Sequence, residues 1–166
     1  MKNLDRNVTL LCPLCGNDQF LSLDEEFEDL LHAGDDARVR CSDCGSEYTK
    51  RELLDSNAAI IDNAVDELAQ DAVKELGTWI GENNHTLIYG GSKSGLMGYI
   101  AESVLNAGGT AIGIEPQFFI DEELQYDGLT ELIITKDMTE RKTKMIELGD
   151  AFIAFPGGTG TLEEIS

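Results

Sequence analysis

The stretch that decides the fold is Ala151-Phe152-Ile153-Ala154-Phe155-Pro156-Gly157-Gly158-Thr159-Gly160-Thr161-Leu162-Glu163-Glu164, near the end of the 166-residue sequence. Its first five residues are apolar, which predicts a buried strand. A Pro-Gly-Gly-Thr-Gly turn follows and leads into a predicted helix. Such a turn presents bare backbone N–H groups to an anion, and the helix dipole favours negative charge there. The alternative is a plain connection whose glycines serve only to adopt positive φ angles.

Alternating strands and helices precede this stretch. Strands are predicted at residues 86–89, 110–114 and 132–135. Residues 96–105 are predicted to form a helix between the first two strands. Asp137 and Glu140 have the spacing of a capping box, which starts another helix near Met138. This order predicts a Rossmann-like, doubly wound parallel α/β sheet with right-handed crossovers.

Ligands of such sheets bind at the carboxyl ends of the strands, where two further segments are expected. The loop 90–98 has the pattern G-G-x-x-x-G-x-x-G, which differs from the G-x-G-x-x-G of dinucleotide-binding proteins. Glu115 follows the second strand, where a ribose-binding acid would lie, but one acid gives weak support for a dinucleotide site. A mononucleotide or phosphate remains the expected ligand.

The segment Arg141-Lys142-Thr143-Lys144 places three cations in the first turns of a predicted helix. Cations at that end oppose the helix dipole, so a substrate anion would explain their position. Arg141 is the residue we favour for this role. The alternative is that the lysines are solvated surface residues, which we favour for Lys144.

A long helix is predicted over residues 57–81, after the N-cap formers Asp55, Ser56 and Asn57. Apolar residues recur along it at three- and four-residue steps and form one stripe. The stripe consists of Ile61, Val65, Leu68, Ala72, Leu76 and Trp79. We expect it to pack against the sheet.

Residues 1–52 contain all four cysteines as two C-x-x-C-G knuckles: Cys12, Cys15, Cys41 and Cys44. Two such knuckles predict a tetrahedral, all-thiolate zinc site in a small zinc ribbon. Two disulfides or a redox C-x-x-C are less favoured, because the second knuckle duplicates the first and no βαβ context surrounds them. With sulfur in every position the zinc is expected to be structural, folding a module too small to fold on its own core.

Composition limits the binding partners and the cellular compartment that we expect for the protein. A net charge of −20 argues against nucleic acid or an anionic membrane as a general partner. No apolar run approaches the roughly 20 residues needed to span a bilayer, and the N-terminus has no signal-peptide core. We therefore expect a cytoplasmic protein, where cysteines bind metal more often than they form disulfides.

Three segments together resemble the LOG family, the cytokinin riboside 5′-monophosphate phosphoribohydrolases that are often mislabelled lysine decarboxylases. The family motifs P-G-G-x-G-T-x-x-E, G-G…G-L-M-G and M-x-x-R-K correspond here to residues 156–164, 90–98 and 138–142. Two features depart from the family: Thr139 stands where many members have His, and the cysteine module lies outside the usual domain. Family members also continue beyond the last motif. We therefore expect residues 53–166 to be an incomplete LOG-like Rossmann domain.

The resemblance implies hydrolysis of the N-glycosidic bond of a nucleoside 5′-monophosphate, AMP or N6-modified AMP, to free base and ribose 5-phosphate. A positioned carboxylate stabilises the cationic ribosyl centre and orients water. Motif position assigns that role to Glu164, and Arg141 would bind the phosphate or stabilise charge on the departing base. The substrate-binding residues would be Gly91, Ser92, Met97, Lys142, Gly157, Gly158, Thr159, Gly160, Thr161 and Glu163. We expect no organic cofactor, and a homodimer or higher homo-oligomer.

Other interpretations remain open. Thr161 and Glu164 also have capping-box spacing, which explains the same residues without catalysis. The fold could bind a nucleotide or phosphorylated cofactor without cleaving it, with the zinc ribbon used for docking. A third possibility is that the ribbon mainly mediates oligomer contacts. Lysine decarboxylation is rejected, because no lysine lies in a pyridoxal-phosphate context.

Overall fold

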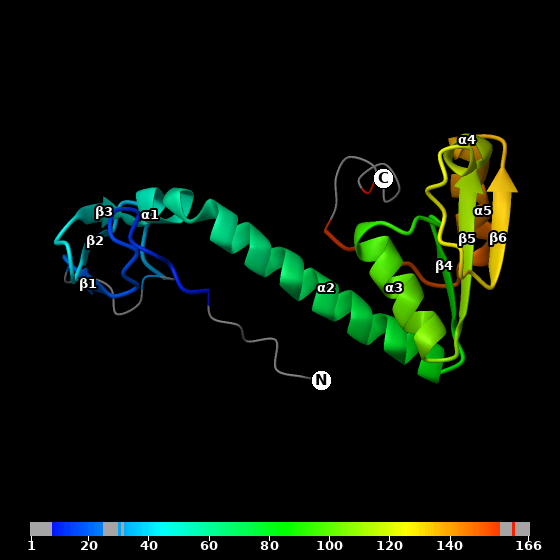
Figure 1. Ribbon diagram of the computed structural model, residues 1–166, viewed down its shortest axis with the longest axis horizontal. Helices are drawn as coiled ribbons and strands as arrows, with labels where there is room; N and C mark the ends of the chain where they lie inside the picture. Colours follow the sequence, from blue (N-terminus) through cyan, green and yellow to red (C-terminus); the bar gives the residue numbers. More distant parts are fainter. Residues whose placement is uncertain (1–7, 25–29, 31, 157–160, 162–166) are drawn as a thin grey trace. The chain divides into compact units, whose positions relative to one another are not determined.

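The computed structural model describes residues 8–24, 30, 32–156 and 161. The chain divides into two compact units, Met1–Glu67 and Leu68–Ser166, which we call unit 1 and unit 2. Figure 1 follows the chain through both, and helix α2 (Ala58–Glu82) runs across the division. Within the described residues, no helix combines the length and the apolar character that crossing a bilayer requires.

Unit 1 contains a small antiparallel sheet of order β1-β2-β3. Its strands are β1 (Phe20–Ser22), β2 (Arg38–Cys41) and β3 (Glu47–Thr49). Helix α1 (Lys50–Ser56) follows β3 directly. It begins with a capping box, because Thr49 accepts from the Glu52 amide while the Glu52 carboxylate accepts from the Thr49 amide at 2.8 Å.

Asn57 joins two distant parts of unit 1 instead of capping α2 with its side chain. Its Oδ1 accepts from the Leu11 amide at 2.8 Å, and its Nδ2 donates to the Leu11 carbonyl at 2.9 Å. Nδ2 also donates to the carbonyl of Leu53, whose side chain is fully buried. Asn57 therefore fixes the segment that carries the first cysteine knuckle to the end of α1.

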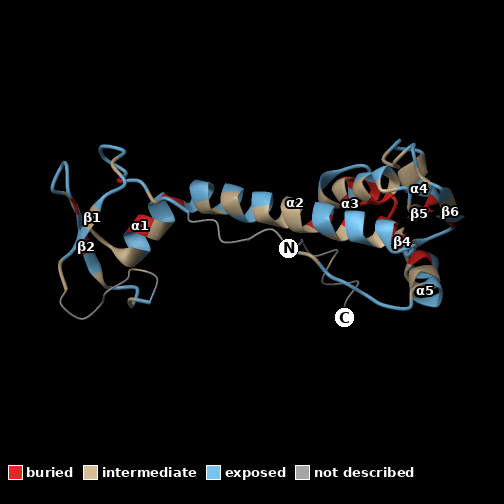
Figure 2. Ribbon diagram, turned by 90° about the horizontal axis from the view of Figure 1, so that it is seen from below, coloured by how far each residue is buried: buried red, intermediate tan, exposed pale blue. Residues whose placement is uncertain are grey.

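Unit 2 is an α/β layer built on a parallel sheet of order β4-β5-β6. The strands are β4 (Thr86–Tyr89), β5 (Thr110–Pro116) and β6 (Glu131–Thr135), and the helices are α3 (Gly95–Asn106), α4 (Gln117–Ile120) and α5 (Met138–Leu148). Helix α3 connects β4 to β5, and α5 follows β6. Figures 1 and 2 show α3 and α5 on opposite faces of the sheet. This arrangement confirms the Rossmann-like fold class predicted from the sequence.

The core of unit 2 lies between the sheet and α3. Its buried residues come from α2, β4, α3 and β5: Val73, Leu87, Tyr89, Ile100, Ala101, Val104 and Ala111. Figure 2 shows this buried group beside α3. The core holds the carboxyl ends of β4 and β5 in fixed register, with Tyr89 paired to Gly113.

The helix α2 is confirmed, but its predicted apolar face is only partly right: Leu76 packs against the core, whereas other members of the stripe do not. Trp79 is 52% exposed and Val65 is also exposed, whereas the buried residues of α2 are Val73, Gly77 and Gly81. A Cβ at Gly77 would lie 2.8 Å from the Ile100 carbonyl oxygen on α3. The helix thus approaches α3 through glycines, which an apolar periodicity does not detect.

The predicted strand at residues 151–155 is also wrong. These residues are described, but they form no strand and pair with neither β4 nor β6. Phe152 is 68% exposed and Ile153 is exposed as well. A parallel strand is stabilised by ladder hydrogen bonds and by cover on both faces. In the described part of the chain this segment has no ladder partner, and only its last residue, Phe155, packs against the core.

Candidate functional sites

The four predicted cysteines meet in unit 1. Their ligand atoms all lie within 4.8 Å of one another, with Sγ–Sγ distances of 3.7 Å for Cys12–Cys44 and 3.5 Å for Cys15–Cys41. A disulfide would require about 2.05 Å, and all four cysteines are free thiols. Tetrahedral zinc with Zn–S bonds of about 2.3 Å needs sulfurs about 3.8 Å apart. The residues therefore fit a metal ion.

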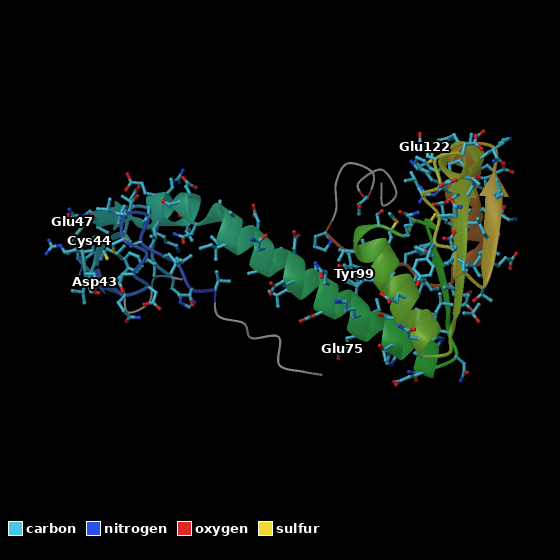
Figure 3. The ribbon with its side chains drawn as sticks, in the orientation of Figure 1. Asp43, Cys44, Glu47, Glu75, Tyr99 and Glu122 are labelled. Carbon is cyan, nitrogen blue, oxygen red and sulfur yellow. The ribbon has the colours of Figure 1, made fainter. Side chains whose placement is uncertain are left out.

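The two knuckles have matching backbone geometry. Gly16 and Gly45 have positive φ angles of 77° and 73°, and their amides donate to the carbonyls of Cys12 and Cys41. The positive φ explains why glycine ends each knuckle. Cys41 ends β2, and Figure 3 shows Asp43 and Cys44 in the turn between β2 and β3.

Two neighbouring polar side chains contact the sulfurs. The Tyr48 hydroxyl lies 3.5 Å from the Cys12 sulfur and lowers the pKa of that thiol to about 6. The side-chain amide of Asn17 donates to the Cys41 sulfur at 3.5 Å. Hydrogen bonds to sulfur favour the thiolate, which is the form that binds metal.

A second site assembles in unit 2, at the carboxyl ends of β4 and β5. Arg141, in the first turn of α5, is 7% exposed, and its Nε donates to the Ile114 carbonyl at 3.0 Å. A Cβ at Gly90 would overlap the Arg141 guanidinium and come within 3.2 Å of the Met97 sulfur. Gly90 therefore leaves the space that the buried cation fills, beside the glycine-rich loop.

The helix that carries Arg141 begins as predicted. The Asp137 carboxylate accepts from the Glu140 amide at 2.9 Å, which makes Asp137 the N-cap. The Glu140 carboxylate accepts from the Lys136 amide instead of completing the capping box. Asp137 and Glu140 supply the negative charge that the helix N-terminus favours. The helix dipole disfavours a cation at this end, so it does not explain why Arg141 is buried there.

The glycine-rich loop is tied to the connection between β5 and β6. The Tyr126 amide donates to the Gly91 carbonyl at 2.9 Å, and the Lys93 amide donates to the Leu124 carbonyl at 3.0 Å. Ser92 and Gln125 form an isolated β-bridge between these bonds. The connection therefore covers the loop that the sequence predicts to bind the nucleotide.

Glu115, for which the sequence pattern offered only weak support, is the most buried acid of this edge. It is 1% exposed, and its Oε2 has no hydrogen-bond partner. Burial raises the pKa of its carboxyl group, and the charge of Arg141 partly opposes that shift. A Cβ at Gly91 would come within 2.6 Å of its Cγ. Its place at the carboxyl end of the second strand was the signal for its importance.

The remaining predicted residues of the nucleotide site are placed as follows. Met97 is 43% exposed in the first turn of α3, and Ser92 and Lys142 are half-buried. Thr161 is half-buried in helical conformation. Gly157, Gly158, Thr159, Gly160, Glu163 and Glu164 lie outside the described residues. The structure thus brings together Gly90, Gly91, Met97 and Arg141 and adds Glu115.

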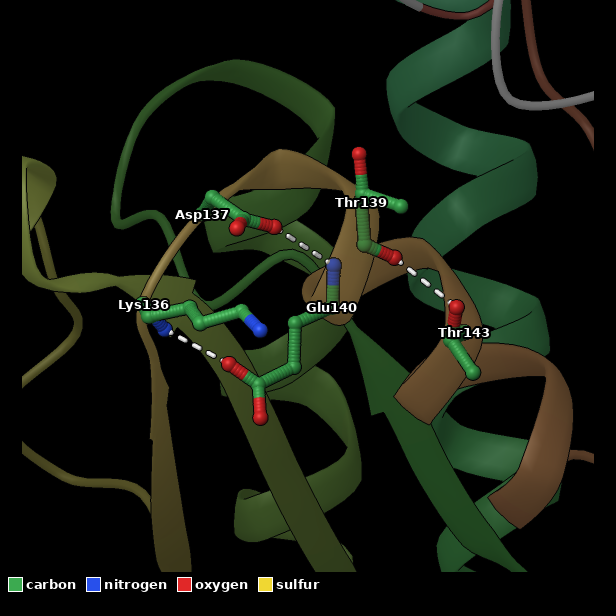
Figure 4. A pocket seen from close by; sticks show the side chains of 5 residues that line it. All are labelled: Lys136, Asp137, Thr139, Glu140 and Thr143. Carbon is green, nitrogen blue, oxygen red and sulfur yellow. Dashed lines mark hydrogen bonds between the residues drawn. The ribbon is translucent and has the colours of Figure 1, made fainter.

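A separate hollow of about 400 Å³ lies on the outer surface at the start of α5. Figure 4 shows its lining: Lys136, Asp137, Thr139, Glu140 and Thr143. The hydrogen bonds drawn there are helix contacts, between Glu140 and the amide of Lys136, between Asp137 and the amide of Glu140, and between Thr143 and the carbonyl of Thr139. None of the predicted site residues lines it.

The parallel sheet with a glycine-rich loop at its carboxyl edge defines unit 2 as a Rossmann-like α/β protein. Residues 97–166 match the family model described as "Possible lysine decarboxylase". Over these residues the chain is similar to this family, and the curated relatives that it matches are named cytokinin riboside 5′-monophosphate phosphoribohydrolases, so the predicted LOG resemblance is confirmed.

Named relatives are similar in sequence, and one solved structure is similar in fold. The chain is 49% identical over 90 residues to the cytokinin riboside 5′-monophosphate phosphoribohydrolase of Rhodococcoides fascians, covering 54% of this chain and 46% of the relative. It is 39% identical over 125 residues to LOG5 of Arabidopsis thaliana, which bears the same name, covering 75% and 48%. The X-ray structure of TM1055 superimposes with a TM-score of 0.52 at 31% identity, covering 61% and 56%. The chain spans about half the length of the curated relatives it matches.

Proposed function

We propose that the protein hydrolyses the N-glycosidic bond of a nucleoside 5′-monophosphate, AMP or N6-modified AMP, to free base and ribose 5-phosphate. The observation that carries this proposal is Arg141. A buried guanidinium at the carboxyl edge of the sheet, against Gly90 and near Met97, suits an anionic substrate. The names of the matched relatives support the reaction type.

The roles follow the chemistry of the reaction. The bond breaks as positive charge develops on the ribosyl carbon, and Glu164 would stabilise that charge and orient the attacking water. Arg141 would hold the phosphate or the departing base. The phosphate would bind to residues 157–161 and Lys142, with Glu163 adjacent, and Gly91, Ser92 and Met97 would line the nucleotide. No organic cofactor takes part in this scheme.

We also propose that the four cysteines bind one structural Zn²⁺ in a zinc ribbon over residues 1–52, followed by a LOG-like Rossmann domain over residues 53–166. The sulfur separations and the matching knuckles support zinc. Four free thiols suit a reducing compartment, which supports a cytoplasmic location. Exposed apolar side chains in unit 2, among them Ile134, Ile146 and Phe152, support a homodimer or higher homo-oligomer.

The test is release of free base and ribose 5-phosphate from AMP and N6-isopentenyl-AMP by the full-length protein, followed by chromatography. Arg141→Ala and Glu164→Gln are each expected to lower kcat/KM by at least about 100-fold, the usual effect of losing a charge-stabilising group. Lys144→Ala is the matched control, because Lys144 pairs with Glu147 at 3.1 Å on the same helix. Tight nucleotide binding without any release by the wild type would refute the proposed reaction.

A further inference from the structure

Three buried polar atoms lie close to the glycine-rich loop without a hydrogen-bond partner: Tyr89 Oη, Glu115 Oε2 and Gln125 Oε1. Tyr89 ends β4, Glu115 lies at the carboxyl end of β5, and Gln125 bridges to Ser92. Tyr89 and Glu115 are near enough that burial and the charge of Glu115 together raise the pKa of the Tyr89 hydroxyl. The orphaned atoms thus belong to one edge of the sheet.

Orphaned buried polar groups are rare in folded proteins, and each one needs an explanation. A buried carboxyl without partners is disfavoured more strongly than a neutral group. Glu115 and Gln125 both present acceptor oxygens, so the group that satisfies them must donate hydrogen bonds. A ligand with neighbouring hydroxyl groups would do so, whereas a phosphate would be repelled by the carboxylate.

The position of Glu115 indicates that the ligand hydroxyl groups are those of a ribose. In Rossmann-like sheets an acid at the carboxyl end of the second strand accepts from the ribose hydroxyls of a bound nucleotide. Here β5 is the strand after the glycine-rich loop and α3, and Glu115 is its penultimate residue. Arg141 approaches the same loop through Gly90, while Glu115 contacts it at Gly91. Cation and acid thus flank two successive glycines.

We propose that Glu115 is a substrate-binding residue that accepts hydrogen bonds from the ribose hydroxyls of the nucleotide. The assignment rests on the proposed function, because it places a ribonucleotide at this edge. It also gives the site a preference for ribonucleotides over deoxyribonucleotides. Since Glu115 is 1% exposed and lies against Gly91, ligand contact requires the glycine-rich loop, which is hydrogen-bonded to segment 124–126, to shift.

Equilibrium binding to the full-length protein tests the assignment, with AMP, 2′-deoxy-AMP and 3′-deoxy-AMP as probes in calorimetry. The wild type is expected to bind AMP at least about tenfold more tightly than one of the deoxy analogues, the usual value of a hydrogen bond to a charged group. Glu115→Met keeps the side-chain length and removes both acceptors. It should weaken AMP binding by a similar factor and leave that analogue unchanged, so the preference disappears.

Two further variants make the result decisive. Glu131→Met, at the exposed start of β6, is the matched control and should keep the wild-type preference. Glu115→Gln keeps one neutral acceptor and should give an intermediate preference, which serves if the Met variant does not fold by circular dichroism. Equal loss of affinity for all three nucleotides in a folded Glu115 variant would show a purely structural role. No discrimination, or no AMP binding, by the wild type would also overturn the assignment.

The proposed reaction and the proposed role of Glu115 can be refuted independently of each other. If the wild type binds AMP with the expected ribose preference but releases no adenine, the hydrolase proposal is refuted while the role of Glu115 stands. If adenine is released and the preference is the same in Glu115→Met, the hydrolase stands and the role of Glu115 is refuted.

Discussion

Units 1 and 2 achieve burial by different means. Among the described residues, the buried core of unit 1 is Cys12, Val39, Cys41 and Leu53, so half of it consists of the cysteines themselves. Unit 2 buries an aliphatic and aromatic cluster between its parallel sheet and α3, and its glycines allow α2 to come close. The difference indicates that burial in unit 1 depends largely on its cysteines, whereas burial in unit 2 depends on the packing of apolar side chains.

This contrast fits general limits on small domains. A module of about 50 residues cannot bury enough apolar surface to offset its conformational entropy, and a structural metal commonly supplies the missing free energy. Unit 2 needs no metal for this purpose, because its core cluster is apolar and contains no residue of unit 1. Each unit should therefore fail under a different perturbation.

Metal removal should have the largest effect, and only on unit 1. Zinc contributes about 10–16 kcal/mol to the folding of small zinc modules, so chelation or Cys41→Ser should abolish the order of β1, β2 and β3. Amide hydrogen exchange read by mass spectrometry would show loss of protection at residues 38–49 and retained protection at residues 86–89. Simultaneous loss of protection in both units would contradict the view that the two units are stabilised independently. A zinc content well below about one ion per chain in reduced protein would count against the site.

Gly77→Ala should have the next largest effect, and only on unit 2. The new Cβ would lie 2.7 Å from the Ser103 Cβ and 2.8 Å from the Ile100 carbonyl oxygen, so backbone has to move. Overpacking of this kind costs about 1–3 kcal/mol, which outweighs the roughly 1 kcal/mol by which alanine favours a helix. Denaturant unfolding would measure the loss. Thr78→Ala, at the exposed neighbouring position, should change stability by about 0.5 kcal/mol or less.

The smallest effect is a pH dependence that unit 2 owes to Glu115. Its folded-state pKa is raised by burial, so the folded protein holds this proton more tightly than the unfolded chain does. Stability from this group is complete below the unfolded pKa of about 4.3 and is lost as pH rises through the raised folded pKa. The free energy of unfolding of the wild type should therefore fall relative to Glu115→Gln as pH rises from about 4.3. A constant difference between the two proteins would contradict the buried-acid account.

The sequence predicted elements best where local signals and tertiary structure agree. The strand at 86–89, the helix after the glycine-rich loop and the Asp137 cap are all found in the structure. The two C-x-x-C-G knuckles predicted the cysteine cluster, because turn geometry and ligand chemistry are both local. These features depend on neighbours within a few residues, so a single sequence contains them.

The predictions that failed concern which residues of an element are buried and which other elements they contact. The apolar period of α2 predicted the helix and the core contact of Leu76 but not the fully buried positions, because Gly77 and Gly81 contribute contact without hydrophobicity. The run at 151–155 has the composition of a buried strand, yet composition cannot supply the pairing that makes one. Glu115 was undervalued for a related reason, since it is buried against Gly91, which only the fold brings to it.

The hydrogen bonds between the glycine-rich loop and the connection after β5 affect how fast these segments can separate. The amides of Lys93 and Tyr126 donate across the junction in opposite directions, and the Lys93 ammonium donates to the Glu123 carbonyl at 2.8 Å. Neither segment can separate without breaking the bonds of the other, so they open as one cooperative unit. If Glu115 binds the ribose as proposed, the rate at which that unit opens would set an upper limit on how fast a nucleotide reaches it.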